Sequence, residues 1–431
     1  MKKTAVNIAR IIVASVFILS GFVKAVDPLG SLYKLTDYLE AMHLGGLLPD
    51  WGVLIIAVLQ AGIEFCLGLF LLFAIQRRFT SRFILVIMIA MTPLTLWLAL
   101  ANPISDCGCF GDALVLNNWQ TFWKNVVLLG LSVIVAKWPT EMFRFVSEPN
   151  QWIVTNYSAL FILGISAWCL YDLPLFDFRP YHVGASIKEG MEIPEGAATP
   201  EYNTIFVMEK DGKRQTFTVE NYPDSTWTFV EAKTELVKEG YVPPIHDFLL
   251  TNEEGDDVTD DLLLDTGYVF MLVSPHLEVA DDSRFDLINE LSEYAEEHGY
   301  PFYGVTASSQ EGISRWRETT GAEYPFCQAD EITLKTIIRS NPGLVLLKKG
   351  TVIRKWGHNN LPTIDDTMTS QPLENFEIGQ MPEDSVPRKI ASLLLWFVLP
   401  LALLTIADRT WMWTRWLRRK HKAEKKKEKQ L

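Results

Sequence analysis

The chain has 431 residues, of which 48% are hydrophobic and 21% charged, and its formal net charge at pH 7 is −13. This length allows more than one domain, and apolar and charged residues are segregated along the chain rather than mixed. The acidic balance argues against nucleic acid as a partner.

Six apolar segments approach the roughly 20 residues that a helix needs to cross a bilayer. They are Ala5–Val23, Gly52–Phe73, Phe83–Leu100, Trp119–Ala136, Ile153–Tyr171 and Ile390–Ala407. The first lacks a clear cleavage site, so we interpret it as a retained span rather than a signal peptide. The fourth is the weakest because Lys124 and Asn125 lie in its first turns, where a lysine can reach the interface.

Positive charge predicts the orientation of these spans. It gathers before the first span, between the second and third, after the fourth, and after the sixth, where residues 409–431 hold ten Lys or Arg against two Glu. Alternating spans place all four segments on one side. We therefore expect a multi-pass protein of the cytoplasmic (inner) membrane, surrounded by membrane lipid, with both termini cytoplasmic.

The opposite side then receives the loop Lys24–Trp51, a Cys-Gly-Cys loop and residues 178–388. The last segment carries 38 Asp or Glu against 17 Lys or Arg, so nearly all of the negative charge is predicted to be extracytoplasmic. Disulfides persist in such a compartment. The charge pattern therefore places the Cys-Gly-Cys loop on the side of the membrane that cysteine redox chemistry requires.

The Cys-Gly-Cys loop lies between the third and fourth spans and reads Asp106-Cys107-Gly108-Cys109-Phe110-Gly111-Asp112. A disulfide needs Cα atoms roughly 4.4–6.8 Å apart, which residues i and i+2 reach only in a tight turn. Gly108 permits the positive φ of such a turn, and the strained ring would be easily reduced. We therefore predict that Cys107 and Cys109 are a catalytic redox pair. Asp106 and Asp112 would raise the pKa of these thiols.

Two other interpretations of the pair stay open: reduced structural thiols, or half of a metal site. Zinc and copper sites usually need further Cys or His, and His43 is the nearest candidate in the membrane domain, so we favour redox chemistry and predict no metal. Cys169, near the outer end of the fifth span, is a candidate resolving thiol, although a lone cysteine in an apolar helix is usually a small hydrophobe. Cys66 is expected to pack in the second span, and Cys327 has no obvious local partner.

Glu64 lies near the middle of the second span, where an ionised carboxylate is costly and often functional. The alternative is a protonated carboxyl group hydrogen-bonded between helices. Lys24 and Asp27 are three residues apart at the end of the first span, close enough to pair before the helix ends at Pro28. A contact between Lys24 and Glu64 is an alternative that the sequence alone does not establish. We expect Glu64, Lys24 and Asp27 to tune the site or relay protons, with a quinone as a candidate cofactor.

These positions resemble a known family. Gly21-x-x-Lys24-x-x-Asp27-Pro28, Glu64 and Cys107-Gly108-Cys109-Phe110-Gly111 are similar to the DoxX/MauE group of four-helix membrane proteins, over roughly residues 5–140. The MauE branch is associated with maturation of methylamine dehydrogenase, a disulfide-rich periplasmic enzyme. The resemblance therefore implies disulfide formation or electron supply, and the whole architecture resembles DoxX-family proteins of Bacteroidetes.

The segment after the fifth span has two predicted parts. Tyr202–Val219 is typical of a β-hairpin, and Asn221–Leu264 is harder to place. From Gly267 the pattern predicts strands at Tyr268–Ser274, Pro301–Ala307, Leu344–Lys348 and Thr351–Trp356, and helices at Asp282–His298, Ile313–Thr319 and Ile332–Arg339.

This order resembles a thioredoxin-like fold of the peroxiredoxin or TlpA kind over about residues 263–362. Pro342 lies where that family has a cis-proline. The segment departs from the family after its first strand, where Ser274-Pro275-His276-Leu277-Glu278-Val279 replaces a Cys-x-x-Cys motif. The domain is therefore not a dithiol oxidoreductase by itself, and we expect it to dock a partner protein or to cover the membrane loop.

The predicted fold is thus a polytopic α-helical membrane protein, a four-helix DoxX-like bundle with two further spans, and an exported α/β thioredoxin-like domain. The expected divisions are residues 1–140 (bundle), 141–177 (fifth span), 178–262 (β-containing segment), 263–388 (thioredoxin-like domain and linker), 389–408 (sixth span) and 409–431 (basic tail).

The favoured function is a membrane thiol–disulfide oxidoreductase or electron-transfer protein that acts on an exported protein or a redox partner. A non-catalytic assembly or binding protein, with a permanent Cys-Gly-Cys bridge, is the main rival, and the missing Cys-x-x-Cys motif favours it. A small-solute transporter with Glu64 on its path is a third possibility. The sequence shows neither the internal repeats nor, beyond Pro93, the broken helices that are typical of transporters.

Overall fold

The computed structural model describes residues 2–104, 106–194, 196–198, 201–210, 213–218, 228–238, 240–364, 371–383 and 386–428. Among these residues, six helices are long and apolar enough to span a membrane: α1 (Lys2–Val26), α3 (Asp50–Phe73), α4 (Arg77–Ala101), α5 (Asn118–Lys137), α6 (Gln151–Tyr171) and α12 (Val386–Glu428). Each predicted span lies inside one of them, and α5 has the lowest hydropathy. The chain is a multi-pass membrane protein.

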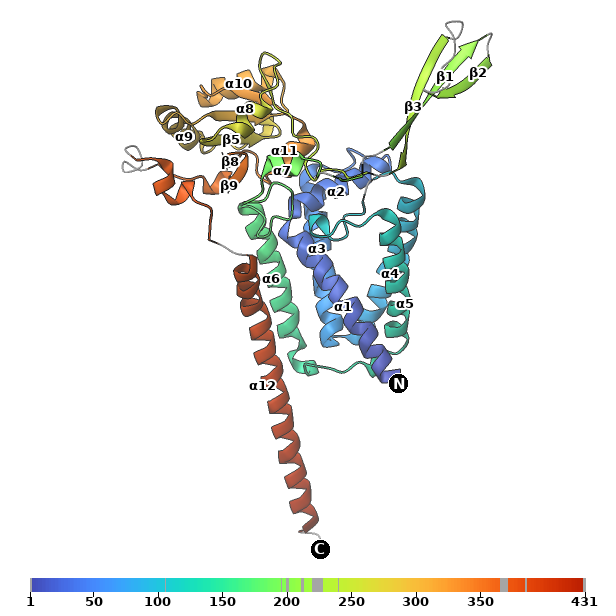
Figure 1. Cartoon of the computed structure of the whole chain (residues 1–431). Helices are drawn as coiled ribbons and strands as arrows, with labels where there is room; N and C mark the ends of the chain where they lie inside the picture. Colours follow the sequence, from blue (N-terminus) through green and yellow to red (C-terminus); the bar gives the residue numbers. More distant parts are fainter. Residues whose placement is uncertain are drawn as a thin grey trace.

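The helices α1 and α3 cross with their backbones in direct contact. A Cβ atom added to Gly21 would lie 2.3 Å from the backbone nitrogen of Phe65, and one added to Gly68 would lie 2.7 Å from a backbone nitrogen of α1. Small residues allow such close crossings between membrane helices. On one side of this crossing, α6 and α12 add an aromatic contact in which the ring centroids of Phe161 and Phe397 are 4.2 Å apart. On the other side, α4 pairs with α5 (Figure 1).

The positively charged segments gather at one end of the bundle. Arg10, Arg77 and Arg409 all donate hydrogen bonds to carbonyl oxygens of the segment between α5 and α6. The N-terminus and the far end of α12 point the same way, and we call this the terminal end (Figure 1). The opposite end carries the Cys-Gly-Cys loop, and we call it the loop end.

A short helix, α2 (Pro28–Ala41), covers the loop end. The first membrane helix ends before Pro28, as predicted, but α2 was not predicted within the outer segment of residues 24–51. Pro28 is the first residue of α2, a position where its missing N–H costs nothing. The Asp27 carboxylate caps the new helix by accepting a hydrogen bond from the Gly30 backbone N–H at 2.9 Å.

The thioredoxin-like domain is a six-stranded mixed sheet with helices around it. Its elements are β4 (Thr251–Asn252), α8 (Thr259–Leu264), β5 (Tyr268–Ser274), α9 (Phe285–Glu297), β6 (Phe302–Thr306), α10 (Gln310–Thr320), β7 (Phe326–Gln328), α11 (Glu331–Ile337), β8 (Gly343–Lys348) and β9 (Thr351–Gly357). The strand order is β4-β7-β6-β5-β8-β9. The strands β5, β6 and β7 run parallel, while β8 and β9 are antiparallel neighbours.

This topology confirms the thioredoxin-like prediction, including the three predicted helices and four predicted strands. Apolar side chains fill both faces of the sheet, as the fully buried strand β5 requires. The peptide bond Asn341–Pro342 is cis, as the resemblance implied. The short strands β4 and β7 and the helix α8 were not predicted.

A separate antiparallel sheet with the order β2-β1-β3 is formed by β1 (Glu201–Lys210), β2 (Lys213–Thr218) and β3 (Thr228–Lys238). The predicted hairpin is confirmed by the pairing of Lys210 with Lys213, although its last residue, Val219, lies outside the described residues. The strand β3 was not predicted. A short helix, α7 (Ile187–Met191), precedes this sheet.

Candidate functional site

The Cys-Gly-Cys loop forms the tight turn that its sequence predicts. Gly108 has a φ of +63°, which a residue with a side chain rarely adopts. Its backbone N–H donates to the Asp106 carboxylate at 2.7 Å, and its carbonyl accepts from the Gly111 N–H at 3.1 Å. Both cysteines are free thiols. The turn therefore holds two thiols close together without a covalent bond.

The two thiols differ in acidity. The Cys107 thiol hydrogen-bonds to the sulfur of Cys109, and this contact, with the nearby charges of Lys124 and Lys24, lowers the pKa of Cys109 to about 6 against the effect of burial. The same hydrogen bond and burial raise the pKa of Cys107. These contacts therefore favour the thiolate on Cys109 and the proton on Cys107.

The sequence analysis considered only the two loop carboxylates, whereas the groups that lower the pKa of Cys109 are Cys107, Lys124 and Lys24. The expected effect of Asp106 and Asp112 on the thiols stays a prediction. Both carboxylates have cationic partners: Asp106 pairs with Lys34 at 3.0 Å, and Asp112 pairs with an arginine of the thioredoxin-like domain at 3.3 Å.

Lys124 is a site residue that the sequence analysis missed as such. It was noted only as a weak point of the fourth span. Its Nζ lies 4.5 Å from the ring centroid of Phe110, directly after Cys109 in the chain, and this contact holds the ammonium group beside the loop. The sequence did contain a signal, because a lysine in the first turns of a membrane helix is energetically costly and is therefore often functional.

A cluster of polar side chains lies beneath the loop, between α1 and α3. The Lys24 ammonium donates to both Glu64 carboxylate oxygens at 2.8 Å, and Gln60 donates to the same carboxylate at 3.2 Å. The Ser20 hydroxyl lies 2.7 Å from Glu64 Oε2 and 2.7 Å from the carbonyl oxygen of Cys109. The structure therefore brings Lys24 and Glu64 together and connects them to the cysteine loop.

Asp27 has a different partner from the one predicted. The expected Lys24–Asp27 pair is wrong, because Lys24 turns toward Glu64 while the start of α2 carries Asp27 the other way. The Asp27 carboxylate instead accepts from Arg339 Nε at 3.0 and 3.2 Å. Arg339 belongs to the thioredoxin-like domain, 312 residues further along the chain.

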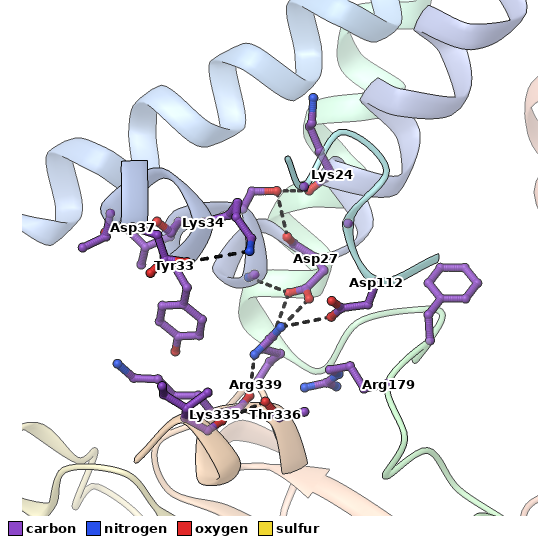
Figure 2. Close-up of a pocket in the computed structure, with 18 of the residues that line it drawn as sticks. Lys24, Asp27, Tyr33, Lys34, Asp37, Asp112, Arg179, Lys335, Thr336 and Arg339 are labelled. Carbon is purple, nitrogen blue, oxygen red and sulfur yellow. Dashed lines mark hydrogen bonds and ion pairs between the residues drawn. The ribbon is translucent and has the colours of Figure 1, made fainter. Parts of the chain in front are cut away.

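A cavity of about 520 Å³ lies between α2, the Cys-Gly-Cys loop and α11. Figure 2 shows Asp27, Asp112, Arg179 and Arg339 around it. Of the loop, Asp106, Gly108, Gly111 and Asp112 line this cavity, whereas Cys107 and Cys109 do not.

Comparison with known proteins identifies the helical part of the chain. Residues 2–138 match the family model described as methylamine utilisation protein MauE. These residues are therefore similar to the MauE family, and we call them the MauE domain. The MauE resemblance inferred from the sequence is thereby confirmed. Residues 202–239, at the three-stranded sheet, match a domain of unknown function, DUF8463. Among curated proteins, none matches the chain.

Two solved structures are similar to part of the chain. A putative protein disulfide isomerase from Bacteroides thetaiotaomicron is 18% identical, with a TM-score of 0.21, over 25% of this chain and 73% of that one. A thio-disulfide isomerase from Thermus thermophilus is 19% identical, with a TM-score of 0.21, over 26% of this chain and 81% of that one.

The polar residues that suggested the MauE resemblance gather at the loop end. Lys24, Glu64, Cys107 and Cys109 form one connected group, while Asp27 faces the thioredoxin-like domain. The family match and the local geometry thus point to the same part of the molecule.

The remaining cysteines do not join this group in the described contacts. Cys169 is buried in α6, close to the backbone of Leu175 rather than to the loop thiols. Cys66 packs against the core of the MauE domain. Cys327 is buried in the sheet of the thioredoxin-like domain, where burial raises its pKa to about 11.

His276 lies in the segment that stands in place of the Cys-x-x-Cys motif of thioredoxin-like proteins. Its Nε2 lies 3.0 Å from the Glu331 carboxylate, and its side chain is partly exposed. Within the described residues, no group of three or more His, Cys, Asp or Glu is arranged to hold a metal ion. The only paired thiols in the described part of the chain are therefore those of the MauE domain.

Proposed function

We propose that the protein exchanges thiols and disulfides with exported proteins at the outer face of the cytoplasmic membrane, through Cys107 and Cys109. The observation that carries this proposal is the tight turn at Gly108, which holds the free thiols of Cys107 and Cys109 close together with the Lys124 ammonium beside the loop. A thiolate is the nucleophile in disulfide exchange, and the second thiol completes the reaction.

The exchange would take place in two steps. The Cys109 thiolate attacks a sulfur of the partner's disulfide, so that a mixed disulfide forms and a partner thiolate leaves. Cys107 then transfers its proton to that thiolate and attacks Cys109, which releases the second partner sulfur and closes the Cys107–Cys109 disulfide. Two electrons pass to the partner, and the reverse sequence would oxidise a partner dithiol.

Lys24 and Glu64 are proposed to tune this pair. The Lys24 charge favours the Cys109 thiolate, while Glu64 holds Lys24 by two hydrogen bonds of 2.8 Å. The Ser20 hydroxyl, which contacts both Glu64 and the Cys109 carbonyl, connects this charge pair to the backbone of the cysteine loop. A quinone as electron acceptor and Cys169 as a resolving thiol stay predictions.

The proposed location rests on the charge pattern. Lys and Arg residues gather at the terminal end, which the positive-inside rule assigns to the cytoplasm. The thioredoxin-like domain and the loop then share the oxidising side. The partner is an exported protein or a redox protein, and no nucleic acid is expected.

The rival function is a non-catalytic assembly protein with a permanent Cys107–Cys109 bridge. The thioredoxin-like domain favours it, because its only described cysteine is Cys327, buried in the core. Such a domain would bind a partner rather than exchange disulfides with it.

Trapping the thiols of intact cells with a membrane-impermeant maleimide, before and after mild reduction, separates the two functions. Mass spectrometry reads Cys107 and Cys109 separately, and Cys327 serves as a buried reference. A partly oxidised pair that follows the redox supply supports exchange. A pair that stays fully oxidised and resists mild reductant supports the assembly function and contradicts our proposal.

A further inference from the structure

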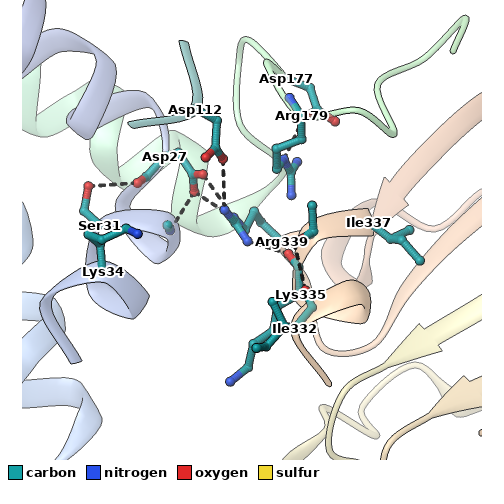
Figure 3. Close-up of polar contacts among 12 residues, drawn as sticks. Asp27, Ser31, Lys34, Asp112, Asp177, Arg179, Ile332, Lys335, Ile337 and Arg339 are labelled. Carbon is teal, nitrogen blue, oxygen red and sulfur yellow. Dashed lines mark hydrogen bonds and ion pairs between the residues drawn. The ribbon is translucent and has the colours of Figure 1, made fainter. Parts of the chain in front are cut away.

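Arg339 connects the thioredoxin-like domain to the MauE domain. It follows α11 and extends toward the loop end, where its Nε lies 3.0 Å from Asp27 Oδ2 and its Nη2 lies 3.3 Å from Asp112 Oδ2 (Figure 3). Its side chain is only 7% exposed. One buried guanidinium therefore joins two carboxylates that come from different elements of the MauE domain.

Both carboxylates lie on elements that hold the redox loop. Asp112 is in the short turn Gly111–Ala113, three residues after Cys109. Asp27 caps α2, and that helix carries Tyr38, whose hydroxyl donates to the Cys107 carbonyl at 2.9 Å. The contacts of Arg339 thus reach both sides of the Cys-Gly-Cys turn.

The contact with α2 is close and specific. A Cβ atom added to Gly30 would lie 2.9 Å from Arg339 Nη2, so the helix has no side chain where the guanidinium approaches. The ring of Tyr33 lies 5.2 Å from the guanidinium carbon on the same helix. An arginine can bind two carboxylates through its planar fork, which a lysine cannot do with comparable geometry.

A second group of charged residues also joins the thioredoxin-like domain to the rest of the chain. Asp177, in the segment after α6, accepts from Arg179 Nε at 2.7 Å and from Lys355 Nζ of β9 at 2.9 Å. Burial opposes the ionised carboxylate, but these two cations prevail and lower the pKa of Asp177 to about 2. The thioredoxin-like domain is therefore held at the loop end by ion pairs whose cationic side chains are buried.

We propose that Arg339 is a positioning residue for the redox loop: by binding Asp27 and Asp112, it keeps the Cys107–Cys109 turn closed while the thioredoxin-like domain is docked. A domain without a dithiol thereby acquires a role in the exchange. Displacement of the domain by a partner would release Asp27 and Asp112 and so loosen the turn that holds the partly exposed Cys109. The importance of this control for activity rests on the proposed function, but the control of thiol accessibility can be measured independently.

The test uses the full chain in lipid vesicles and measures two quantities, the rate of maleimide labelling at Cys109 and the reduction potential of the pair in glutathione buffers. Removal of one partner of a buried ion pair is costly, so Arg339→Gln should increase the labelling rate at least about tenfold. Arg339→Lys keeps the charge without the fork and should give an intermediate rate. The reduction potential of the Cys107–Cys109 pair should likewise change more in Arg339→Gln than in Arg339→Lys.

Arg317→Gln is the matched control. Arg317 makes an ion pair of 2.6 Å with Glu253 inside the thioredoxin-like domain, so its loss should leave both quantities unchanged. Labelling of Cys327, which is 1% exposed, reports whether the domain has unfolded. If Arg339→Gln unfolds it, Asp112→Asn becomes the deciding variant, since Asp112 belongs to the MauE domain.

Unchanged labelling and potential in a folded Arg339→Gln protein, or in Asp112→Asn, would overturn the proposal. Faster labelling with a pair that never changes oxidation state in cells would support the positioning role while contradicting the proposed exchange. The two proposals therefore fail separately.

Discussion

The hydroxyl oxygen of Ser20, in the first membrane helix, lies 2.7 Å from the carbonyl oxygen of Cys109. The same hydroxyl lies 2.7 Å from the Glu64 carboxylate and 3.2 Å from the Lys24 ammonium. The charge pair inside the bundle and the cysteine loop above it therefore share one hydrogen-bonding group. A substitution in the charge pair should therefore affect the cysteine loop, and a substitution in the loop should affect the charge pair.

The pH dependence of Cys109 follows from its lowered pKa. Only the thiolate reacts, so the alkylation rate should rise through pH 6 and level off by about pH 7.5, whereas an ordinary thiol would still be gaining rate near pH 8.5. Lys124→Met removes a neighbouring positive charge and should move the midpoint up by about one pH unit. Lys137→Met, at the other end of α5, is the control. An unchanged midpoint in Lys124→Met would contradict this account.

The Lys24–Glu64 pair should show strong coupling. Lys24→Met or Glu64→Leu alone leaves a poorly hydrated charge without its partner and should cost roughly 3 kcal/mol of stability. The double variant removes both charges and should be more stable than either single variant. Thermal unfolding in detergent, read as a double-mutant cycle, measures this coupling. Additive losses would show that the two side chains do not interact.

The crossing of α1 and α3 should tolerate no added methyl group. Gly21→Ala places a Cβ atom 2.3 Å from the backbone of Phe65, which forces the helices apart, and we expect a loss of about 2 kcal/mol or more. Gly164→Ala in α6 is the control because no atom lies within 4 Å of its added Cβ. Denaturation should show opposite changes in the free energy of unfolding. Gly21→Ala should lose stability, whereas Gly164→Ala should gain some, because alanine favours helices by up to about 1 kcal/mol over glycine.

The role of Cys169 can be decided by one substitution. Because this thiol is buried in α6 and contacts the segment after its own helix, Cys169→Ser should leave the oxidised fraction of the loop pair unchanged. Cys107→Ser, in contrast, should trap a mixed disulfide at Cys109. Non-reducing gels followed by mass spectrometry measure both results. If Cys107 and Cys109 no longer changed oxidation state in Cys169→Ser, Cys169 would be the resolving thiol after all.

Local patterns in the sequence predicted most of the fold. The apolar spans and the alternation of strand and helix from Tyr268 onward reflect burial, which depends on residue type and spacing. The tight turn at Gly108 was also predictable, because glycine is the residue that accepts its backbone angles. The helix α2 was missed because Pro28 signals a helix start as well as a helix stop, and only the Asp27 cap distinguishes the two.

Partner choice among charged residues could not be predicted. Lys24 had Asp27 nearby in sequence, yet it pairs with Glu64, and Asp27 pairs with Arg339. These choices depend on how α1 turns into α2 and on how the thioredoxin-like domain docks, which no local pattern encodes. The effect of Lys124 on Cys109 was missed for the same reason, because Lys124 comes from a helix that lies after the loop.

The thioredoxin-like domain is held by the chain at both of its ends, since α6 precedes it and α12 follows it. Its docking contacts are therefore intramolecular, and a tethered module experiences an effective concentration in the roughly millimolar range. A free partner that binds the loop end must compete with this local excess. A partner that binds weakly would not displace the thioredoxin-like domain from the loop end. The two covalent connections of this domain therefore restrict access to partners that are abundant or bind tightly.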